Sequence, residues 1–242
     1  MKTIITYHSA KDNLAVLLTL LQAQMVMPEE IIVIDTSADK SGLEVVQKFT
    51  NRKSGVPVKV ECSRVGIYTA WNLGIDLAGE DCDVLIMNDD LLVPLNFIDI
   101  LGLVAMNVKA YAIVPNTPKR EHYSSIVDMP FDFYAKMPEN GEDIDIVDWM
   151  PGFCFYLSKE CIKDVGLFDD KHYKCWFGDD DYQNRIKKKA LKNNIIPIFR
   201  INSMFVYHYG GKSYKYQSKE VKNLIIKDRK NYAKKTKKSL QK

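Results

Sequence analysis

The sequence predicts an α/β protein built on a mostly parallel sheet flanked by helices, and two observations lead to this prediction. Short runs of aliphatic residues alternate with segments of helical periodicity, which is typical of successive β-α-β units. The chain has 242 residues, of which 46% are hydrophobic and 27% charged, so it is long enough to bury a core. This composition excludes collagen-like, mucin-like and prion-like proteins.

The first half of the chain carries the clearest pattern of strands and helices. Strands are expected at residues 3–7, 31–34, 58–60, 84–87 and 112–114. One amphipathic helix is indicated by the apolar stripe Leu14, Leu17, Leu18 and Leu21. A second, buried helix is indicated by Ala70, Leu73, Ile75 and Leu77. These elements alternate as a parallel sheet requires.

The second half is less regular. A loop is expected over residues 116–145, followed by a strand at 146–149, a turn at 151–152 and a strand at 153–157. A helix is then predicted at 159–165, and another after Asp179. No internal repeat is visible, so a single domain is expected.

Charge is distributed unevenly along the chain. The net charge is +3, but residues 212–242 alone carry +10, which leaves −7 for residues 1–211. The simplest interpretation of this basic tail is a solvated terminal helix with a frayed end. The alternative is a surface for a polyanionic glycan, an anionic membrane surface or nucleic acid.

The cysteines and the apolar runs of the sequence indicate in which cellular compartment the protein is expected. The five cysteines are odd in number and form no C-x-x-C pair, so neither a disulfide framework nor a zinc site is expected. No apolar run resembles a signal peptide or reaches the roughly 20 residues that span a bilayer. These features favour reduced thiols and a cytoplasmic protein.

Polar residues follow four of the predicted strands, where open α/β sheets bind ligands. They are Thr6-Tyr7-His8-Ser9, Asp35-Thr36-Ser37-Ala38-Asp39, Ser63-Arg64-Val65-Gly66 and Asn88-Asp89-Asp90. A turn with a helix cap is an equally simple interpretation of the stretch that begins at Asp35. Asp89 and Asp90, however, would repel each other unless a cation lies nearby, which indicates a functional role.

A second acidic cluster, Asp179 to Asp181, opens a predicted helix. Acidic residues belong in the first turn of a helix, but a cap needs only one of them. Three in succession are suited to a reaction that needs a carboxylate base. His208, considered alone, is more typical of a structural or surface histidine than of a metal ligand.

Taken in order, these motifs resemble those of family 2 glycosyltransferases, enzymes of the GT-A fold that transfer sugars from nucleotide-sugar donors. The first half contributes V-I-D-x-S-x-D at residues 33–39, A-W-N-L-G at 70–74 and the D-x-D-like triplet at 88–90. The second half contributes P-G-F-C-F-Y-L-S at 151–158, V-G-L-F-D at 165–169 and the acidic cluster. This second set also looks like the galactosyltransferase branch of the fold. The resemblance extends to about Gly211.

The resemblance implies a Rossmann-like GT-A domain with three parts. Residues 1–115 would form the nucleotide-sugar-binding half, 116–211 the acceptor-binding and catalytic half, and 212–242 the basic tail. The implied activity is a metal-dependent, inverting transfer of a sugar, with a UDP-sugar favoured as donor, to an acceptor hydroxyl. The acceptor would be a glycan, a lipid-linked molecule or another polyanion. The basic tail is a candidate contact for nucleic acid or a membrane surface.

The resemblance also implies roles for individual residues. Asp90 and His208 would hold Mn²⁺ or Mg²⁺, which stabilises a leaving nucleoside diphosphate. Asp179 would be the catalytic base, or Asp180 if the register slides by one, because Gly178 stands where the family has Glu. The implied donor-binding residues are Thr6, Tyr7, His8, Asp35, Ser37, Arg64, Gly66, Asn72, Asn88, Asp89, Trp149 and Gly152.

The sequence also departs from the family's pattern at the D-x-D triplet, and it lacks the motifs of several other protein classes. Asn88 replaces the first carboxylate of the D-x-D motif. The glycine motifs of dinucleotide-binding proteins and P-loop proteins are missing, as are the G-x-S-x-G and H-E-x-x-H motifs. A sugar nucleotidyltransferase should have a glycine-rich, arginine-containing loop after the first strand, and residues 9–12 do not form one. A non-catalytic module that binds nucleotide-sugars or polyanions on the same fold remains the alternative.

Overall fold

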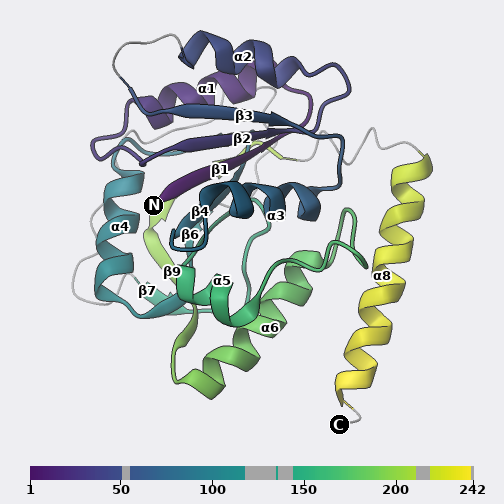
Figure 1. The fold of residues 1–242 in the computed structure, drawn as a ribbon. Coiled ribbons are helices and arrows are strands. Elements are labelled where there is room, and N and C mark those ends of the chain that lie inside the picture. The colour runs from purple at the N-terminus through teal and green to yellow at the C-terminus, as the bar shows by residue number, and fades with distance from the viewer. Residues whose placement is uncertain (51–54, 118–134, 136–143, 211–218, 241–242) are drawn as a thin grey trace.

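A mostly parallel sheet of eight strands is the centre of the computed structural model, which describes residues 1–50, 55–117, 135, 144–210 and 219–240 (Figure 1). Within these residues the strand order is β3-β2-β1-β4-β8-β6-β9-β7, and β10 pairs with β5 in a separate ribbon. The strands are β1 (Lys2–Tyr7), β2 (Ile31–Asp35), β3 (Val58–Cys62), β4 (Val84–Asn88), β5 (Leu91–Leu92), β6 (Ala110–Asn116), β7 (Ile144–Ile146), β8 (Cys154–Leu157), β9 (Ile196–Phe205) and β10 (Tyr207–His208).

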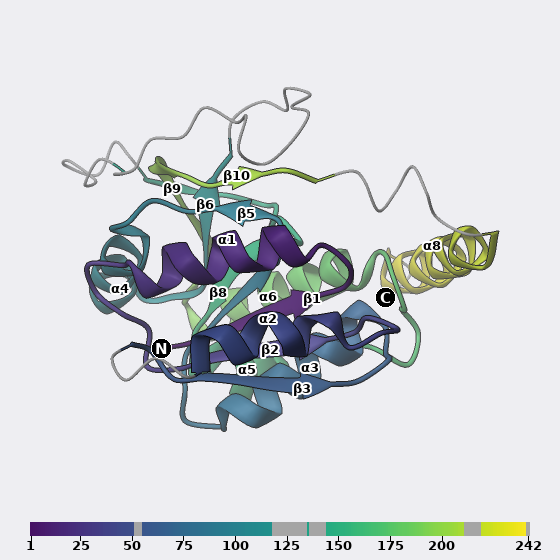
Figure 2. The same cartoon turned by 90° about the horizontal axis from the view of Figure 1, so that it is seen from above.

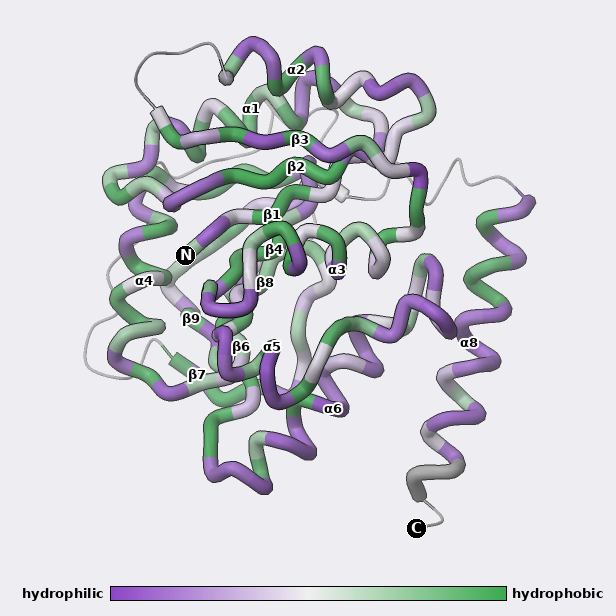
Figure 3. Tube along the Cα trace, viewed as in Figure 1, coloured by the Kyte–Doolittle hydropathy of each residue, from purple (hydrophilic) through white to green (hydrophobic). Residues whose placement is uncertain are grey.

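Helices cover both faces of the sheet (Figure 2). They are α1 (Lys11–Gln22), α2 (Ser41–Thr50), α3 (Ile67–Ala78), α4 (Phe97–Asn107), α5 (Lys159–Val165), α6 (Gly178–Asn193) and α8 (Lys219–Leu240). One apolar core joins the sheet to α1, α2 and α4, and a second joins it to α3, α5 and α6. The strands buried between them are hydrophobic along nearly their whole length, as parallel strands covered on both faces are (Figure 3).

The predicted strands of the first half are confirmed, and each is one to four residues longer than its sequence pattern. The first four are parallel to one another: β1 lies between β2 and β4, and β2 pairs with β3. Some of the added residues are polar, such as Asp35 and Asn88, which still take part in the ladder of backbone hydrogen bonds. A polar side chain does not end a strand as long as the backbone N–H and C=O groups still find hydrogen-bond partners on the adjacent strand.

The strand predicted at 146–149 is wrong by two or three residues. The observed strand, β7, pairs antiparallel with β9 from Ile144 to Ile146, and the chain then leaves the sheet. Trp149, which made the stretch look strand-like, is instead 55% exposed. The strand at 153–157 is confirmed as β8, and the loop predicted at 116–145 lies mostly outside the described residues.

The helix predicted from residues 70–77 is confirmed as α3, but its buried face differs from the prediction. Leu77 is 44% exposed, whereas Ile75 is buried with Tyr68 and Trp71. Those three residues lie three to four positions apart, so they share one face of the helix, and Leu77 falls off that face. The α1 stripe is confirmed, because all four of its leucines are fully buried.

The C-terminal helix α8 begins at Lys219, inside the segment that was predicted to be a basic terminal helix. It stands at the side of the molecule, and its surface is mostly hydrophilic (Figures 1 and 3). Among the described helices, none is both long and apolar enough to cross a membrane.

The buried face of α3 gives a test of the fold. Ile75→Ala should lower the free energy of unfolding by about 2–5 kcal/mol, because it leaves a cavity against the sheet. Leu77→Ala on the same helix should change it by less than about 0.5 kcal/mol, since that side chain already faces water. Urea unfolding of both variants measures the difference, and equal losses would contradict the assigned face.

Candidate functional site

The carboxyl ends of β1, β2 and β4 meet at one edge of the sheet. Their register pairs Tyr7 with Asp35, and Thr6 with Asn88, so the polar residues that follow the three strands are neighbours. The His8 ring nitrogen Nδ1 lies 3.3 Å from Thr36 Oγ1, and the His8 backbone N–H points at Asp89 Oδ2 at 3.5 Å. The sequence prediction that these loops gather at one edge is confirmed.

Several predicted donor-binding residues at this edge have buried side chains, namely Thr6, Tyr7, Asp35 and Ser37. The carboxylate of Asp35 accepts hydrogen bonds from the backbone N–H and hydroxyl of Ser37, at 2.9 and 2.6 Å, and from the Leu43 N–H at 3.2 Å. The Tyr7 hydroxyl lies 2.8 Å from Ser41 Oγ. These contacts hold the start of α2 against the sheet, which is the turn-and-cap role that the sequence left open.

The remaining predicted donor-binding residues are distributed differently. His8 and Arg64 are exposed at the edge of the sheet, and Gly66 is half-buried before α3. Asn72 is not brought to this edge: its amide bonds both the N–H and the carbonyl of Phe168, at 2.9 and 3.0 Å. It ties α3 to the segment after α5.

Asp90 and His208 come from distant parts of the chain and lie side by side in the structure. The short ribbon of β5 and β10 pairs His208 with Leu91, and it places His208 Nε2 3.2 Å from Asp90 Oδ1. The Gly210 N–H donates to the other carboxylate oxygen at 3.0 Å, and the Tyr209 N–H donates to the Asp90 carbonyl. Two groups that are 118 positions apart in sequence thus form one polar cluster.

The two adjacent carboxyl groups have opposite pKa shifts. Burial, reinforced by the charge of Asp90, raises the pKa of Asp89 to about 8. Burial acts in the same direction on Asp90, but the His208 imidazole and the Gly210 N–H outweigh it and lower the pKa of Asp90. At neutral pH Asp90 therefore carries the negative charge of the pair.

The Asp90 carboxylate and the His208 ring are of the kinds that bind a divalent cation. Asp90 Oδ1 is buried and accepts no well-aligned hydrogen bond from the described residues, although it faces the His208 ring. A carboxylate oxygen suits Mg²⁺ and Mn²⁺, and an imidazole nitrogen is a common metal ligand. Among the described residues, no three His, Cys, Asp or Glu side chains come close enough to hold an ion by themselves. A cation here would need further oxygen ligands from a bound molecule.

Asp179 occupies the first turn of α6 and is held from two sides. The Tyr68 hydroxyl of α3 donates to Asp179 Oδ1 at 2.9 Å. Gly152 lies under the other oxygen, because a Cβ added at that glycine would come within 2.4 Å of Asp179 Oδ2. Any side chain at position 152 would therefore displace the carboxylate.

The neighbouring acidic residues differ in their partners. Asp180 accepts a hydrogen bond from Gln183 at 3.0 Å, and burial together with the charge of Asp179 raises its pKa. Asp181 is nearly fully buried and pairs with Arg185 at 3.2 Å and with Lys235 at 2.7 Å. Asp181 is therefore a structural member of the cluster.

The segment Gly152-Phe153 joins Asp179 to the Asp90–His208 pair. The Phe153 carbonyl accepts from the Asn88 N–H at 2.8 Å, and its ring stacks on that of His208 with centroids 4.2 Å apart. Gly152, one residue earlier, contacts Asp179. The two clusters therefore flank the same two residues and form one continuous site.

Sequence reasoning did not identify Tyr68 or Phe153 as site residues. Phe153 lies in the P-G-F run and Tyr68 lies two residues before A-W-N-L-G, but an aromatic residue in such a place usually belongs to the core. Only the packing of α3 against α6, and of β8 against β4, turns them toward the site.

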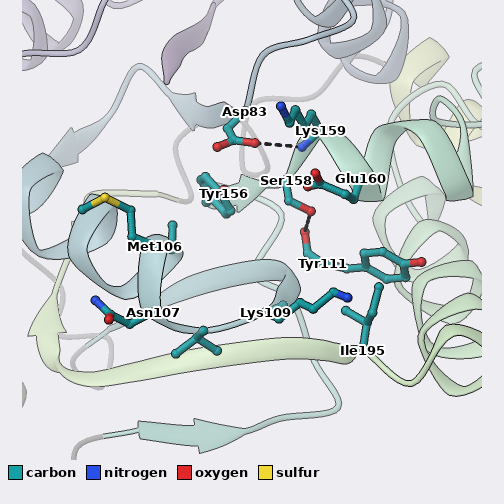
Figure 4. Close-up of a pocket in the computed structure, with 13 residues that line it drawn as sticks. Asp83, Met106, Asn107, Lys109, Tyr111, Tyr156, Ser158, Lys159, Glu160 and Ile195 are labelled. Atoms are coloured by element: carbon teal, nitrogen blue, oxygen red, sulfur yellow. Dashed lines mark hydrogen bonds between the residues drawn. The ribbon is translucent and has the colours of Figure 1, made fainter.

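A pocket on the molecule lies away from this site (Figure 4). Its lining includes Asp83 and Lys109, which precede β4 and β6, and Ser158, which follows the antiparallel β8. These positions mark the amino-end edge of the parallel strands, opposite the edge that carries the site. The pocket therefore takes no part in the arrangement of Asp90, His208 and Asp179.

The fold is shared with solved glycosyltransferase structures, of which this chain spans about half the length. TarS of S. aureus in complex with UDP-GlcNAc has a TM-score of 0.61 and 15% identity, over 90% of this chain and 62% of that one. GalNAc-T7 with UDP, GalNAc and Mn²⁺ has a TM-score of 0.59 and 16% identity, over 86% of this chain and 43% of that one.

The mannosyltransferase PcManGT of Pyrobaculum calidifontis, in complex with GDP-Man and Mn²⁺, has a TM-score of 0.61 and 16% identity, over 87% of this chain and 57% of that one. At these identities the structures establish a common GT-A fold. No curated protein matches this chain. The family model "Glycosyl transferase family 2" matches residues 3–125, about half of the chain, and includes the triplet at 88–90. The chain therefore belongs to glycosyl transferase family 2.

Proposed function

We propose that this protein catalyses the metal-dependent, inverting transfer of a sugar from a UDP-sugar to an acceptor hydroxyl. The observation that carries the proposal is the pair of carboxylates on either side of Gly152-Phe153, Asp90 next to His208 and Asp179 next to Tyr68. One is placed to serve a leaving group and the other an attacking group. Family membership, the TarS complex with UDP-GlcNAc and the GalNAc-T7 complex with UDP, GalNAc and Mn²⁺ support the choice of donor.

The first carboxylate serves the donor. Asp90 and His208 would hold Mn²⁺ or Mg²⁺, with the diphosphate of the donor completing the ligands; Mn²⁺ is present in two of the similar structures. When bound, the cation stabilises the negative charge that develops on the leaving nucleoside diphosphate. His8 and Arg64 are exposed at the same edge, so their side chains are free to reach the donor. The other donor contacts implied by the sequence stay predictions.

The second carboxylate serves the acceptor. We assign Asp179, and not Asp180, as the base, because Asp179 is oriented by both Tyr68 and Gly152 whereas Asp180 bonds its own helix through Gln183. The acceptor hydroxyl loses its proton to Asp179 as its oxygen bonds to the anomeric carbon. The bond from that carbon to the UDP oxygen breaks at the same time, and its electron pair leaves with UDP. Attack opposite the leaving group inverts the configuration.

A non-catalytic donor-binding module is the second candidate. It is favoured by Asn88, which stands where the D-x-D motif has its first carboxylate, and by the incomplete set of metal ligands in the described residues. A thermal-shift screen of UDP- and GDP-sugars with Mn²⁺, Mg²⁺ or EDTA, followed by donor-hydrolysis assays, separates the two. Stabilisation without hydrolysis or transfer would favour the module, and no stabilisation by any donor would contradict both.

The metal assignment predicts a strong dependence on Asp90. Asp90→Ala should lower transfer by at least about 10²-fold, the effect of losing one strong electrostatic stabiliser. His208→Ala should weaken Mn²⁺ affinity by about 10-fold or more, measured by titration in the presence of UDP. Asp76→Ala, which removes an exposed carboxylate on α3, is the matched control and should change neither value. Wild-type activity of Asp90→Ala in EDTA would overturn the assignment.

The base assignment predicts a separation of binding from chemistry. Asp179→Asn should bind the UDP-sugar within about 3-fold of wild type and lose about 10² to 10⁴ in the rate of transfer. Asp180→Asn should lose far less, because its carboxylate faces Gln183. Isothermal titration and steady-state kinetics measure the two effects. If the losses are reversed, Asp180 is the base.

The Tyr68 contact predicts a smaller effect of the same kind. Tyr68→Phe removes the hydroxyl that orients Asp179 and should lower the turnover number by about 10-fold while leaving donor affinity unchanged. Tyr111→Phe is the control, because Tyr111 makes a similar bond to Asp164 at the opposite edge of the molecule. Equal turnover in the two variants would show that the Tyr68 hydroxyl does not act through Asp179.

A further inference from the structure

Helix α8 is attached to the loop that leads into the acidic cluster. One face of α8 carries the buried position 228 and the partly buried positions 221, 224, 225, 231, 232 and 236, which recur every three to four residues. Asn231 donates to the His172 carbonyl at 2.8 Å, and Asn184 of α6 donates to the Tyr232 hydroxyl at 2.9 Å. The basic side chains Lys222, Lys230 and Lys237 are exposed. The helix is therefore docked along one face, in contrast to the helix solvated all round that the simplest interpretation of the basic tail predicts.

Asp228 is the centre of this contact. Its side chain is fully buried, and its Oδ2 accepts from the backbone N–H groups of Lys174, Cys175 and Trp176, at 2.9, 2.8 and 3.1 Å. Three successive N–H groups that converge on one point form an anion-binding nest. Here the anion is a carboxylate of the same chain, so the nest sets the shape of the loop.

The loop needs such support because its backbone is in an uncommon conformation. Phe177 has φ 68° and ψ −4°, the left-handed region that residues other than glycine seldom adopt. Such conformations persist where surrounding contacts over-determine them, and they gather at functional sites. The Phe177 ring also stacks on Tyr232 of α8, with centroids 5.4 Å apart. Asp179 is only two residues further on.

The opposite side of the loop rests on the donor-binding half. A Cβ added at Gly66 would lie 2.6 Å from the Lys174 carbonyl oxygen, so the loop backbone touches the residue that precedes α3. Tyr68, the second residue of that helix, holds Asp179. The loop is therefore clamped between α3 and Asp228, and its position decides where α6 begins.

We propose that Asp228 is a positioning residue for the transfer reaction, acting through the loop 174–177 to set the position of Asp179. The proposal rests on the assignment of Asp179 as the base. Asp228 touches neither donor nor acceptor; it fixes three amides, and those amides fix the residue that begins α6. The basic tail of the sequence is thus part of the catalytic unit and is more than a recruiting surface.

The other contacts of α8 make a test practical. Lys235 pairs with Asp169 at 3.1 Å and with Asp181 at 2.7 Å, and the Asn231 and Tyr232 contacts lie outside the nest. A substitution at position 228 should therefore release the three amides without detaching the helix.

The test compares three variants of the full-length protein. Asp228→Ala removes the carboxylate that accepts the three hydrogen bonds. Asp228→Asn keeps a side chain of the same shape with one oxygen that can accept them, and Lys230→Ala changes an exposed residue of the same helix. The measurements are hydrogen exchange of the amides at 174–176, affinity for the UDP-sugar with Mn²⁺, and the turnover number of transfer. Thermal unfolding reports overall stability.

For Asp228→Ala we expect amide exchange at 174–176 to accelerate by at least about 10-fold and turnover to fall by about 10-fold or more, while donor affinity changes by less than about 3-fold. Asp228→Asn should lie between this variant and wild type, and Lys230→Ala should match wild type. If Asp228→Ala does not fold, Asp228→Asn provides the test: its turnover number should fall while its affinity for the donor stays nearly unchanged.

Three results would overturn the proposal, two of them from exchange and turnover and a third from donor affinity. The first is wild-type turnover in a folded Asp228 variant whose amides exchange rapidly, and the second is unchanged exchange at 174–176. Failure of the underlying function is distinguishable: wild-type transfer by Asp179→Asn would refute the base. Loss of donor affinity in step with stability in Asp228→Ala would mean that Asp228 only stabilises the fold.

Discussion

The parallel pairing of β1 with β2 on one side and β4 on the other is the constraint on which the site depends. Parallel strands must all end at the same edge, so the polar residues after these three strands become neighbours although they come from distant parts of the chain. The strands are buried on both faces, and their hydrophobic side chains supply the stability that holds the edge in place. The edge can therefore carry a buried carboxylate, that of Asp35, although its removal from water costs free energy.

The antiparallel strand β8 joins the two halves of the chain. It pairs with β4 through Met87 and Cys154, and this register brings Phe153 next to Asn88 at the very end of β4. Gly152 then contacts Asp179, and the Phe153 ring contacts His208. A shift of one residue in this register would turn every side chain of β8 to the other face of the sheet and separate the two carboxylate clusters.

The aspartates in and around the site differ in their electrostatic surroundings. The Asp90 carboxylate is favoured in its charged form by His208 and the Gly210 N–H, whereas burial favours the neutral form of Asp89. Asp181 is paired with the cations of Arg185 and Lys235, whereas Asp228 accepts hydrogen bonds from three backbone N–H groups. Asp179 accepts a hydrogen bond from Tyr68 of α3, whereas Asp180 accepts one from Gln183 of its own helix, so of these two carboxylates only that of Asp179 is held by a neighbouring element.

The sequence alone determined the class of fold, the strands of the first half and the motifs at 88–90 and 179–181, because these depend on local periodicity and on residue types at short spacing. It also indicated Asp90, His208 and Asp179, but only through the order of the family's motifs. The sequence could not tell whether Asp35 contacts a ligand or caps a turn, which of the acidic residues at 179–181 faces the site, or that α8 supports the loop before α6. Those points depend on partners far away in the chain, such as Leu43 for Asp35, Tyr68 and Gly152 for Asp179, and Lys174 for Asp228. A hydrogen bond or a close backbone contact between distant residues leaves no periodic signal in the sequence, so only the tertiary structure decided them.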